Sequence, residues 1–333
     1  MIRIIEPGLL STIQDEGRHG FQQYGIITNG VMDPFALRIA NYIVGNEKDE
    51  AGIEVTLTGP TIQFEESMLI AVCGADYSAL IDNEPMPLWR PVLVQKGSTL
   101  HMKFSKKGCR AVIAVGGGLD IPAVMNSKST YVRAGIGGFK GRALEKEDVL
   151  QIGPLSEQTK QIIHSLTKKG KTYMTSDWSI SAAYLNDLYE RETIRVMKGR
   201  QYDEFSESSR NEFWEETYKL SPQSDRMGFR LNGPVLERTV SEELLSEAVS
   251  FGTIQVPSDG EPIILLADRQ TIGGYPKIGQ VASIDLPVLA QKKPGESLRF
   301  EKISHTEAQE SILKRERAIR ELKWSIELKV RRG

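Results

Sequence analysis

The chain repeats four short segments in the same order along its length. The pairs are "IRIIEPG" from Ile2 and "IRVMKG" from Ile194, "LTGP" from Leu57 and "LNGP" from Leu231, "DNEP" from Asp82 and "DGEP" from Asp259, and "QKGSTLHMKF" ending at Phe104 and "QKKPGESLRF" ending at Phe300. Chance or common hairpin chemistry could produce one or two of these matches, but an ordered set favours two related halves. We therefore expect a duplicated fold, with the second copy beginning near Ile194.

Both halves have the composition of antiparallel sheet. Short runs rich in Val, Ile, Leu and Phe are bounded by Gly, Pro, Asp and Asn, which is typical of strands and turns. The 333 residues also exceed the size at which a single core usually stops growing, about 250–300 residues. We predict a mainly β protein with a few helices, divided into a first domain over residues 1–155, a connecting segment over 156–192, a second domain over 193–304 and a charged C-terminal helix over 305–333.

The clearest internal helix is predicted in "DPFALRIANYIVGN". Asp33 can cap its N-terminus, and Pro34 suits the first turn because a proline there loses no intrahelical hydrogen bond. Apolar residues recur along one side of this segment at helical spacing. Gly45 or Asn46 would end the helix.

The C-terminal segment from Thr306 to Arg332 differs from the rest of the chain because it is highly charged. Ile312, Ile319 and Ile326 fall on one face of a predicted helix. A helix docked on the protein's own surface and a helix that binds a partner both fit this pattern.

Charge and cysteine content exclude several classes of protein. Lys and Arg total 42 against 44 for Asp and Glu, so the chain has no electrostatic footprint for nucleic acid or an anionic membrane surface. No apolar run approaches the ~20 residues that span a bilayer, and the start lacks a signal segment, so we expect a soluble cytoplasmic protein.

Cys73 and Cys109 adjoin apolar runs and are predicted to be buried thiols. Neither they nor the histidines have metal-ligand spacing, so no metal site is predicted.

Common catalytic motifs are missing from the sequence. "GKT" at Gly170 lacks the upstream glycine of a P-loop, and "GIGGFKGR" at Gly135 does not space its glycines as GxGxxG. No serine lies in a GxSxG elbow. "VMKG" at Val196 lacks the flanking residues of a biotin attachment site. The sequence therefore predicts no nucleotide cradle, serine hydrolase site or biotin attachment site of recognisable type.

A charged break interrupts the apolar segment "PIILLADRQTIGGYPKIGQVASIDL" from Pro262. This connection is longer and chemically richer than a hairpin turn needs. Its paired glycines, Gly273 and Gly274, permit a positive φ and a close approach to a ligand. Donors and acceptors come from Asp268, Arg269, Gln270, Thr271 and Tyr275. A ligand-binding loop and an irregular loop that satisfies its own backbone both fit these residues.

A set of long motifs resembles the allophanate hydrolase subunit 2 family over about residues 1–300. The motifs are "PGLLSTIQDEGRHGFQQYGI", "NGVMDPFALRIANYIVGN", "GIEVTLTGP", "AVGGGLDIPAVMNSKSTYVRAGIGGFKGRAL", "SDRMGFRLNGP", "IQVPSDGEPIILLADRQTIGGYPKIG" and "AQKKPGESLRF". The resemblance implies a pair of cyclophilin-like β-barrels. It also implies a subunit of ATP-dependent 5-oxoprolinase, which converts 5-oxoproline, ATP and water into glutamate, ADP and phosphate.

In that family the protein works with a B subunit of similar architecture, KipI, and with an A subunit of a different fold. The resemblance therefore implies that this chain has no activity alone and that the ATP site is shared with, or carried by, a partner subunit. One alternative is a regulatory protein that sequesters KipI and relieves its inhibition of a sporulation histidine kinase. Another is a carboxyltransferase component that acts on a urea-like substrate together with other chains.

Such a reaction needs a cation for the substrate carboxylate and donors for the developing charge, and arginine suits both because its planar fork binds a carboxylate bidentately. We predict Arg226 and Arg269 for these roles, with Asp225 and Asp268 orienting the arginines or moving a proton. The predicted substrate-binding residues are Gln255, Gln270, Thr271, Gly273, Gly274, Tyr275 and Lys277, together with Asp15 and Arg18 from "QDEGRHG" in the first half.

Overall fold

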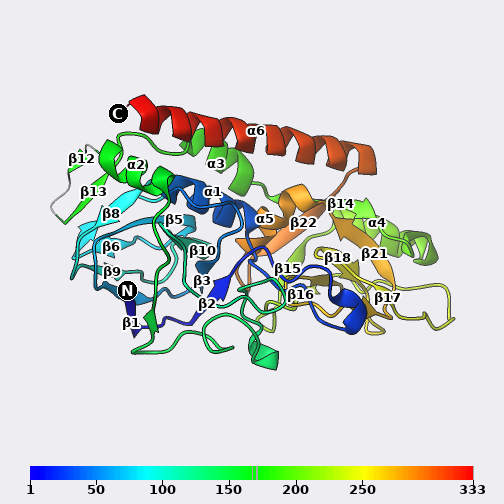
Figure 1. Ribbon diagram of the computed structural model, residues 1–333. Helices are drawn as coiled ribbons and strands as arrows, with labels where there is room; N and C mark the ends of the chain where they lie inside the picture. Colours follow the sequence, from blue (N-terminus) through cyan, green and yellow to red (C-terminus); the bar gives the residue numbers. More distant parts are fainter. Residues whose placement is uncertain (167, 170–171, 333) are drawn as a thin grey trace. The chain divides into compact units, whose positions relative to one another are not determined.

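The computed structural model describes residues 1–166, 168–169 and 172–332, so the first two residues of "GKT" lie outside the described residues. The chain divides into two compact units (Figure 1). The first unit contains Met1–Arg18, Asp33–Leu185 and Ala318–Gly333, and the second contains His19–Met32 and Asn186–Arg317. Each unit is built mainly from β-strands, as predicted.

In the described part of the first unit, the strands form a six-stranded and a seven-stranded sheet. The six-stranded sheet has the order β11 (Val149–Leu150), β1 (Ile2–Glu6), β4 (Thr61–Phe64), β9 (Thr99–His101), β6 (Leu80–Ile81), β7 (Glu84–Pro85). The seven-stranded sheet has the order β12 (Lys168–Lys169), β13 (Tyr173–Thr175), β8 (Val92–Val94), β5 (Met68–Asp76), β10 (Lys107–Val115), β3 (Gly52–Thr56), β2 (Leu10–Gln14). All pairings in both sheets are antiparallel.

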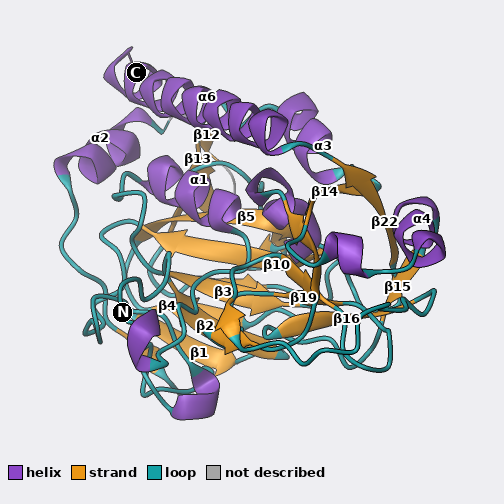
Figure 2. Cartoon of the chain, turned by 90° about the vertical axis from the view of Figure 1, so that its right-hand side faces the viewer, coloured by secondary structure: helices purple, strands orange, loops and turns teal. Residues whose placement is uncertain are grey.

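Helix α1 (Pro34–Val44) covers one face of the seven-stranded sheet, over β5 and β10 (Figure 2). The two strands are almost continuously apolar because both of their faces are buried, one by α1 and one by the core of the unit. Asp33 caps the helix, since its Oδ1 accepts a hydrogen bond from Ala36 N at 2.9 Å. The helix ends at Gly45, whose φ of 78° lies in the left-handed region. Both helix signals in the sequence are thus confirmed.

In the second unit the strands close into a barrel. Its order is β14 (Thr193–Lys198), β21 (Lys277–Val281), β18 (Thr253–Gln255), β19 (Ile263–Leu265), β16 (Gly228–Asn232), β15 (Tyr218–Leu220), β22 (Ser297–Lys302), and β17 (Glu247–Ala248) pairs separately with β20 (Ile272–Gly273). The barrel interior is filled by an apolar core that includes Phe213, Tyr218 and Phe300, whose rings contact one another. The buried carboxylate of Asp285 binds Arg195 beside this core.

Three of the four repeated pairs lie at strands or strand connections in both units. Ile2 and Ile194 lie in β1 and β14, the first strands of their sheets in sequence. "DNEP" forms the turn between β6 and β7, with Asp82 and Asn83 at positive φ, and "DGEP" lies between β18 and β19 with Gly260 at positive φ. The last pair of segments leads into β9 and β22. The pairing of these strands differs between the units, however, because β14 pairs with β22 whereas β1 pairs with β11 and β4, so the duplication stays a prediction.

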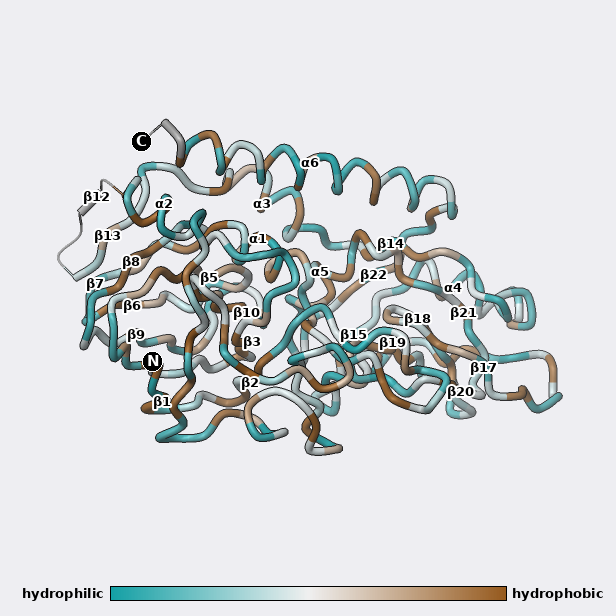
Figure 3. The backbone as a smooth tube through the Cα atoms, viewed as in Figure 1, coloured by the Kyte–Doolittle hydropathy of each residue, from teal (hydrophilic) through white to brown (hydrophobic). Residues whose placement is uncertain are grey.

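The remaining helices are short except for the last. They are η1 (Gln22–Tyr24), η2 (Val132–Ala134), α2 (Glu157–Ser165), α3 (Ala182–Tyr189), η3 (Tyr202–Glu204), α4 (Glu207–Glu215), η4 (Ser283–Asp285), α5 (Leu286–Ala290) and α6 (His305–Arg332). Figure 3 shows α6 as mostly hydrophilic with separate hydrophobic positions. Ile319 and Ile326 of α6 are buried, whereas Trp324 is 65% exposed, so the helix is docked by one face. No helix in the described residues is both long and apolar enough to cross a membrane.

The units do not follow the predicted domain boundaries. Residues 156–185, which the sequence suggested as a connecting segment, group with the first unit and contain α2. Residues 19–32 group with the second unit although they precede it by more than 150 residues in sequence. Composition gives no signal that residues 19–32 belong to the second unit, because this grouping depends on contacts between segments that are far apart in the chain.

Candidate functional site

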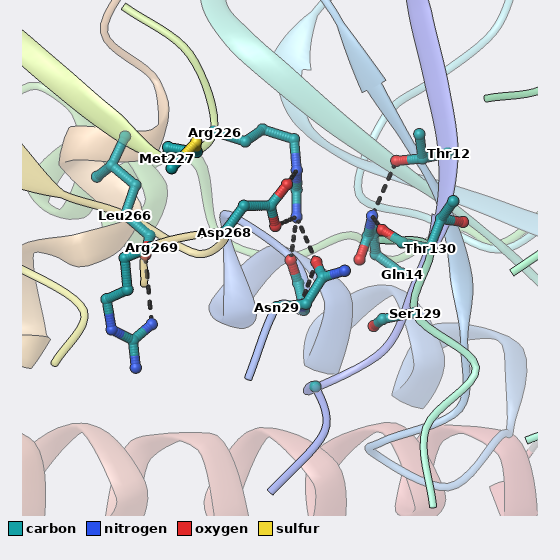
Figure 4. Close-up of polar contacts among 12 residues, drawn as sticks. Thr12, Gln14, Asn29, Ser129, Thr130, Arg226, Met227, Leu266, Asp268 and Arg269 are labelled. Atoms are coloured by element: carbon teal, nitrogen blue, oxygen red, sulfur yellow. Dashed lines mark hydrogen bonds and ion pairs between the residues drawn. The ribbon is translucent and has the colours of Figure 1, made fainter. Parts of the chain in front are cut away.

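A buried ion pair joins two of the predicted site residues, Arg226 and Asp268 (Figure 4). The antiparallel pairing of β16 and β19 continues past Leu265, because Asp268 N donates a hydrogen bond to Arg226 O at 2.9 Å. This places the two side chains opposite each other. Arg226 Nε and Nη2 donate to the two carboxylate oxygens of Asp268 at 3.0 and 2.9 Å. The residues are only 7% and 8% exposed. Asp268 thus orients Arg226, which is one of the two roles considered for it; the other, moving a proton, stays a prediction.

Arg226 also holds the segment of residues 19–32 within the second unit. Its Nη2 donates to Asn29 Oδ1 at 3.0 Å and to Gly30 O at 2.5 Å. Asn29 and Gly30 both have a positive φ, 57° and 98°, so the segment turns sharply where the guanidinium meets it. Sequence reasoning missed Asn29, although it belongs to the "NGVMD" motif, because its partner lies almost 200 residues away.

Asp225, the other aspartate predicted in a catalytic role, stabilises the turn in which it lies. Its Oδ1 accepts hydrogen bonds from Met227 N at 2.7 Å and from Gly228 N at 3.3 Å. The residue is exposed, in contrast to Asp268. Asp225 therefore shapes the turn that leads into β16.

Arg269 follows Asp268 directly, but its side chain points away from the buried pair (Figure 4). Its Nη1 donates to Leu266 O at 3.3 Å, and its buried Nε has no hydrogen-bond partner in the described part of the chain. Burial lowers the pKa of Arg269 from its ordinary value, against the opposing effect of Asp268. A half-buried guanidinium with one weak hydrogen bond of its own is suited to bind an anion through its terminal N–H groups.

A second cluster of predicted residues surrounds the short β17–β20 pairing. Gln255 is buried, and its Nε2 donates to Tyr275 O at 3.2 Å. Lys277 Nζ binds Glu247 Oε2 at 2.8 Å. Thr271 O accepts a backbone hydrogen bond from Val249 N, and Gln270 is partly buried. The structure thus brings Gln255, Tyr275 and Lys277 together and adds Glu247, which sequence reasoning missed.

The two glycines of this loop differ from the prediction. Neither Gly273 nor Gly274 has a positive φ, so conformational freedom does not explain them. At Gly273 a Cβ would lie 2.7 Å from Gln255 Nε2, so the amide of Gln255 would have to shift to admit a larger residue. At Gly274 a Cβ would meet Leu244 O and Ser246 Oγ at an ordinary 3.4 Å.

This difference predicts unequal effects of alanine at the two glycines. Gly273→Ala should displace Gln255 from Tyr275 and lower the free energy of unfolding by about 1–3 kcal/mol, as overpacking usually does. Gly274→Ala should change it by less than ~0.5 kcal/mol. Urea denaturation of both variants measures this, and equal stability of the two would contradict the packing explanation.

Asp15 and Arg18 lie in the first unit, where they hold the loop of residues 124–130. The carboxylate of Asp15 accepts hydrogen bonds from both Ser127 Oγ and Ser129 Oγ, at 2.7 and 2.5 Å. Arg18 is 1% exposed and donates to Val124 O at 3.0 Å and to Ser129 O at 2.5 Å. These contacts give both residues a structural role. Gln14, the preceding buried polar residue, donates to Thr12 Oγ1 and Thr130 O (Figure 4).

A cavity of about 650 Å³ opens beside Tyr275 in the second unit. Val235, Leu244 and Val256 line it, together with three glutamates, Glu237, Glu242 and Glu243. Its lining also contains Arg238, but that guanidinium already binds Glu204 at 2.6 Å. The excess of carboxylates disfavours an anionic ligand in this cavity, in contrast to the surroundings of Arg269.

Metal and thiol chemistry have no visible site among the described residues. No group of three or more His, Cys, Asp or Glu side chains there is placed to hold a metal ion. Cys73 and Cys109 are buried free thiols, as predicted, and burial raises the pKa of Cys73 well above its ordinary value.

The sequence matches the family model described as carboxyltransferase domain, subdomain A and B, over residues 24–302. It is 38% identical to the C subunit of 5-oxoprolinase from Escherichia coli (strain K12) over 327 residues, which cover 98% of this chain and 99% of that protein. It is also 38% identical to the C subunit of 5-oxoprolinase from Haemophilus influenzae over 308 residues, which cover 92% and 93%. The crystal structure of Kluyveromyces lactis urea carboxylase is similar with a TM-score of 0.85 at 27% identity, over 96% of this chain and 29% of that one.

Proposed function

Because the chain belongs to the family of carboxyltransferase domains with subdomains A and B, we propose that it is the C subunit of an ATP-dependent 5-oxoprolinase. The likeness to two proteins of that name covers nearly the whole of each chain. The proposed reaction opens the lactam of 5-oxoproline to give glutamate, with hydrolysis of ATP to ADP and phosphate. The chain would act with an A subunit and with a B subunit, KipI.

The chemistry of the substrate explains which groups such a site needs. A five-membered lactam is a poor electrophile, and ATP would supply activation by phosphorylating the amide oxygen. The protein must then hold the substrate carboxylate and stabilise the negative charge that develops on the reacting group. Both tasks call for fixed cationic donors in a partly buried place, where their interactions are stronger than in water.

The observation that carries this proposal is the half-buried guanidinium of Arg269, whose side chain makes one hydrogen bond, to Leu266 O, in the described part of the chain. Burial penalises an arginine that has no anion, and a bound carboxylate would remove that penalty. The carboxylate of the neighbouring Asp268 binds Arg226 through both oxygens, and the Arg269 side chain points away from it. Arg269 is therefore the candidate cation for substrate, and the Arg226–Asp268 pair fixes the backbone that carries it.

The described residues are less suited to bind ATP than to bind the lactam. The sequence lacks a P-loop, and the cavity beside Tyr275 is lined by an excess of carboxylates, which disfavours a polyphosphate. This supports the placement of the ATP site on a partner subunit or shared with one. A cytoplasmic location fits the two free thiols, since such cysteines stay reduced there.

Assembly is the experiment that tests this function. The isolated chain should fold but form no glutamate from 5-oxoproline and ATP, and co-expression with the B subunit should give one joint species in size-exclusion chromatography with light scattering. Lactam hydrolysis by the pure chain would refute the shared-site proposal. Two separate peaks would count against the B subunit as partner, and with it against a regulatory role as an antagonist of KipI.

Carboxyl transfer is the second candidate, because the structural similarity to urea carboxylase extends over 96% of this chain. The chain carries no recognisable biotin attachment motif, so other chains would have to supply the carboxyl group. Incubation of the assembled complex with carboxybiotin and urea, and separately with 5-oxoproline and ATP, separates the two candidates. We expect glutamate from 5-oxoproline and no carboxylated urea.

A further inference from the structure

Glu247 places one carboxylate between two cations in the second unit. Its Oε2 accepts a hydrogen bond from Lys277 Nζ at 2.8 Å, and its Oε1 accepts one from Arg200 Nη1 at 2.6 Å. The Lys277 side chain is only 13% exposed, whereas that of Arg200 is 73% exposed. The two contacts are therefore unequal, and the partly buried one involves the lysine.

The backbone fixes both ends of the Glu247–Lys277 contact. Glu247 lies opposite Gly273 in the antiparallel pairing of β17 with β20. Lys277 begins β21, where its N donates to Gln201 Oε1 at 3.2 Å and its O accepts from Gln201 N at 3.1 Å. Strand pairing and a side-chain amide thus hold the lysine backbone, and the carboxylate holds its Nζ.

Stability alone gives little reason for this arrangement. Ion pairs near the surface usually contribute about 0–1 kcal/mol, and fixing a lysine side chain costs up to about 2 kcal/mol of conformational entropy. The hydrogen bond and charge of Lys277, with that of Arg200, lower the pKa of Glu247, so the carboxylate stays ionised at neutral pH. The carboxylate accepts from one of the three N–H donors of the lysine and leaves the other two for another group.

We propose that Glu247 is a positioning residue of the candidate site, which holds the Lys277 ammonium so that its remaining donors meet an anionic oxygen of the substrate. This inference rests on the proposed function, because it takes the anionic group bound by Lys277 to be the carboxylate or the activated amide of 5-oxoproline. Arg200 is a secondary contact that holds the second oxygen of Glu247.

The test replaces Glu247 by glutamine in the assembled enzyme. Glu247→Gln keeps the shape of the side chain but loses its charge, so kcat/KM for 5-oxoproline should fall by about tenfold or more. Glu247→Asp should recover part of this loss, since the charge returns on a shorter side chain. Glu301→Gln is the matched control, because Glu301 also pairs with an arginine in this unit and is 51% exposed. It should stay within about twofold of the unaltered enzyme.

A second readout needs no activity. Acetylation of Lys277 by an N-hydroxysuccinimide ester, followed by mass spectrometry of the isolated chain, should become about threefold faster or more in Glu247→Gln, because the amino group is released from the carboxylate that now holds it. Unchanged acetylation would overturn the proposal even if the complex were active. Faster acetylation with full activity would overturn it too, and would leave the proposed function intact. If the unaltered complex forms no glutamate, the proposed function fails, and this positioning role fails with it.

Discussion

Replacement of Asp268 by alanine is expected to lower the free energy of unfolding by about 3–5 kcal/mol, because it leaves the buried guanidinium of Arg226 without its anion. Arg226 is 7% exposed, so water cannot replace the two hydrogen bonds to Asp268. The change should also release the turn at Asn29, since that turn depends on the same guanidinium. Urea denaturation of the isolated chain measures the loss.

The double variant Arg226→Met, Asp268→Leu is the control for this prediction. It removes both charges and fills the space with apolar side chains, which is often nearly neutral for a buried pair, so it should recover most of the lost stability. Activity of the assembled enzyme should stay low in the double variant, because Asn29 still lacks its partner. A loss below ~1 kcal/mol in Asp268→Ala would show that the pair is not a buried constraint.

Replacement of Arg269 by lysine is expected to lower kcat/KM of the assembled enzyme by about tenfold or more. Lysine keeps the charge but loses the planar fork, and about 1.4 kcal/mol of lost transition-state stabilisation already gives a tenfold effect. The stability of the isolated chain should change little, since Arg269 makes one weak hydrogen bond to Leu266 O, at 3.3 Å, within the described residues.

The matched control is Arg230→Lys, which makes the same replacement at an exposed position of the same barrel. It should leave both activity and stability near those of the unaltered chain. If Arg269→Lys behaves like this control while the complex assembles normally, Arg269 is a structural residue, and the anion must be bound elsewhere in the loop.

Local signals in the sequence were sufficient for several elements. The first helix follows from its cap, its proline and its terminal glycine, each of which acts within one turn. The turns at Asp82 and Gly260 also follow from local chemistry, because the backbone geometry of a turn is fixed by neighbouring residues. The family resemblance, which rested on longer motifs, agrees with the matched family model.

Contacts between distant segments could not be predicted from the sequence. The sequence placed Arg226 and Asp268 among the candidates but could not pair them, since their contact depends on the register of β16 against β19. Asn29 and Glu247 were missed for the same reason, because only the folded chain brings them to Arg226 and Lys277. The positive φ expected for Gly274 is wrong, and the close approach of a ligand there stays a prediction.

The most direct test of the central claim is the rate of glutamate formation from 5-oxoproline and ATP by the purified A and B proteins, with and without this chain. We predict no turnover by A and B alone and turnover when the chain is added. When the Arg269→Lys variant is added instead, the rate should fall by about tenfold or more. Full activity of A and B without the chain would contradict its assignment as a component that the reaction requires.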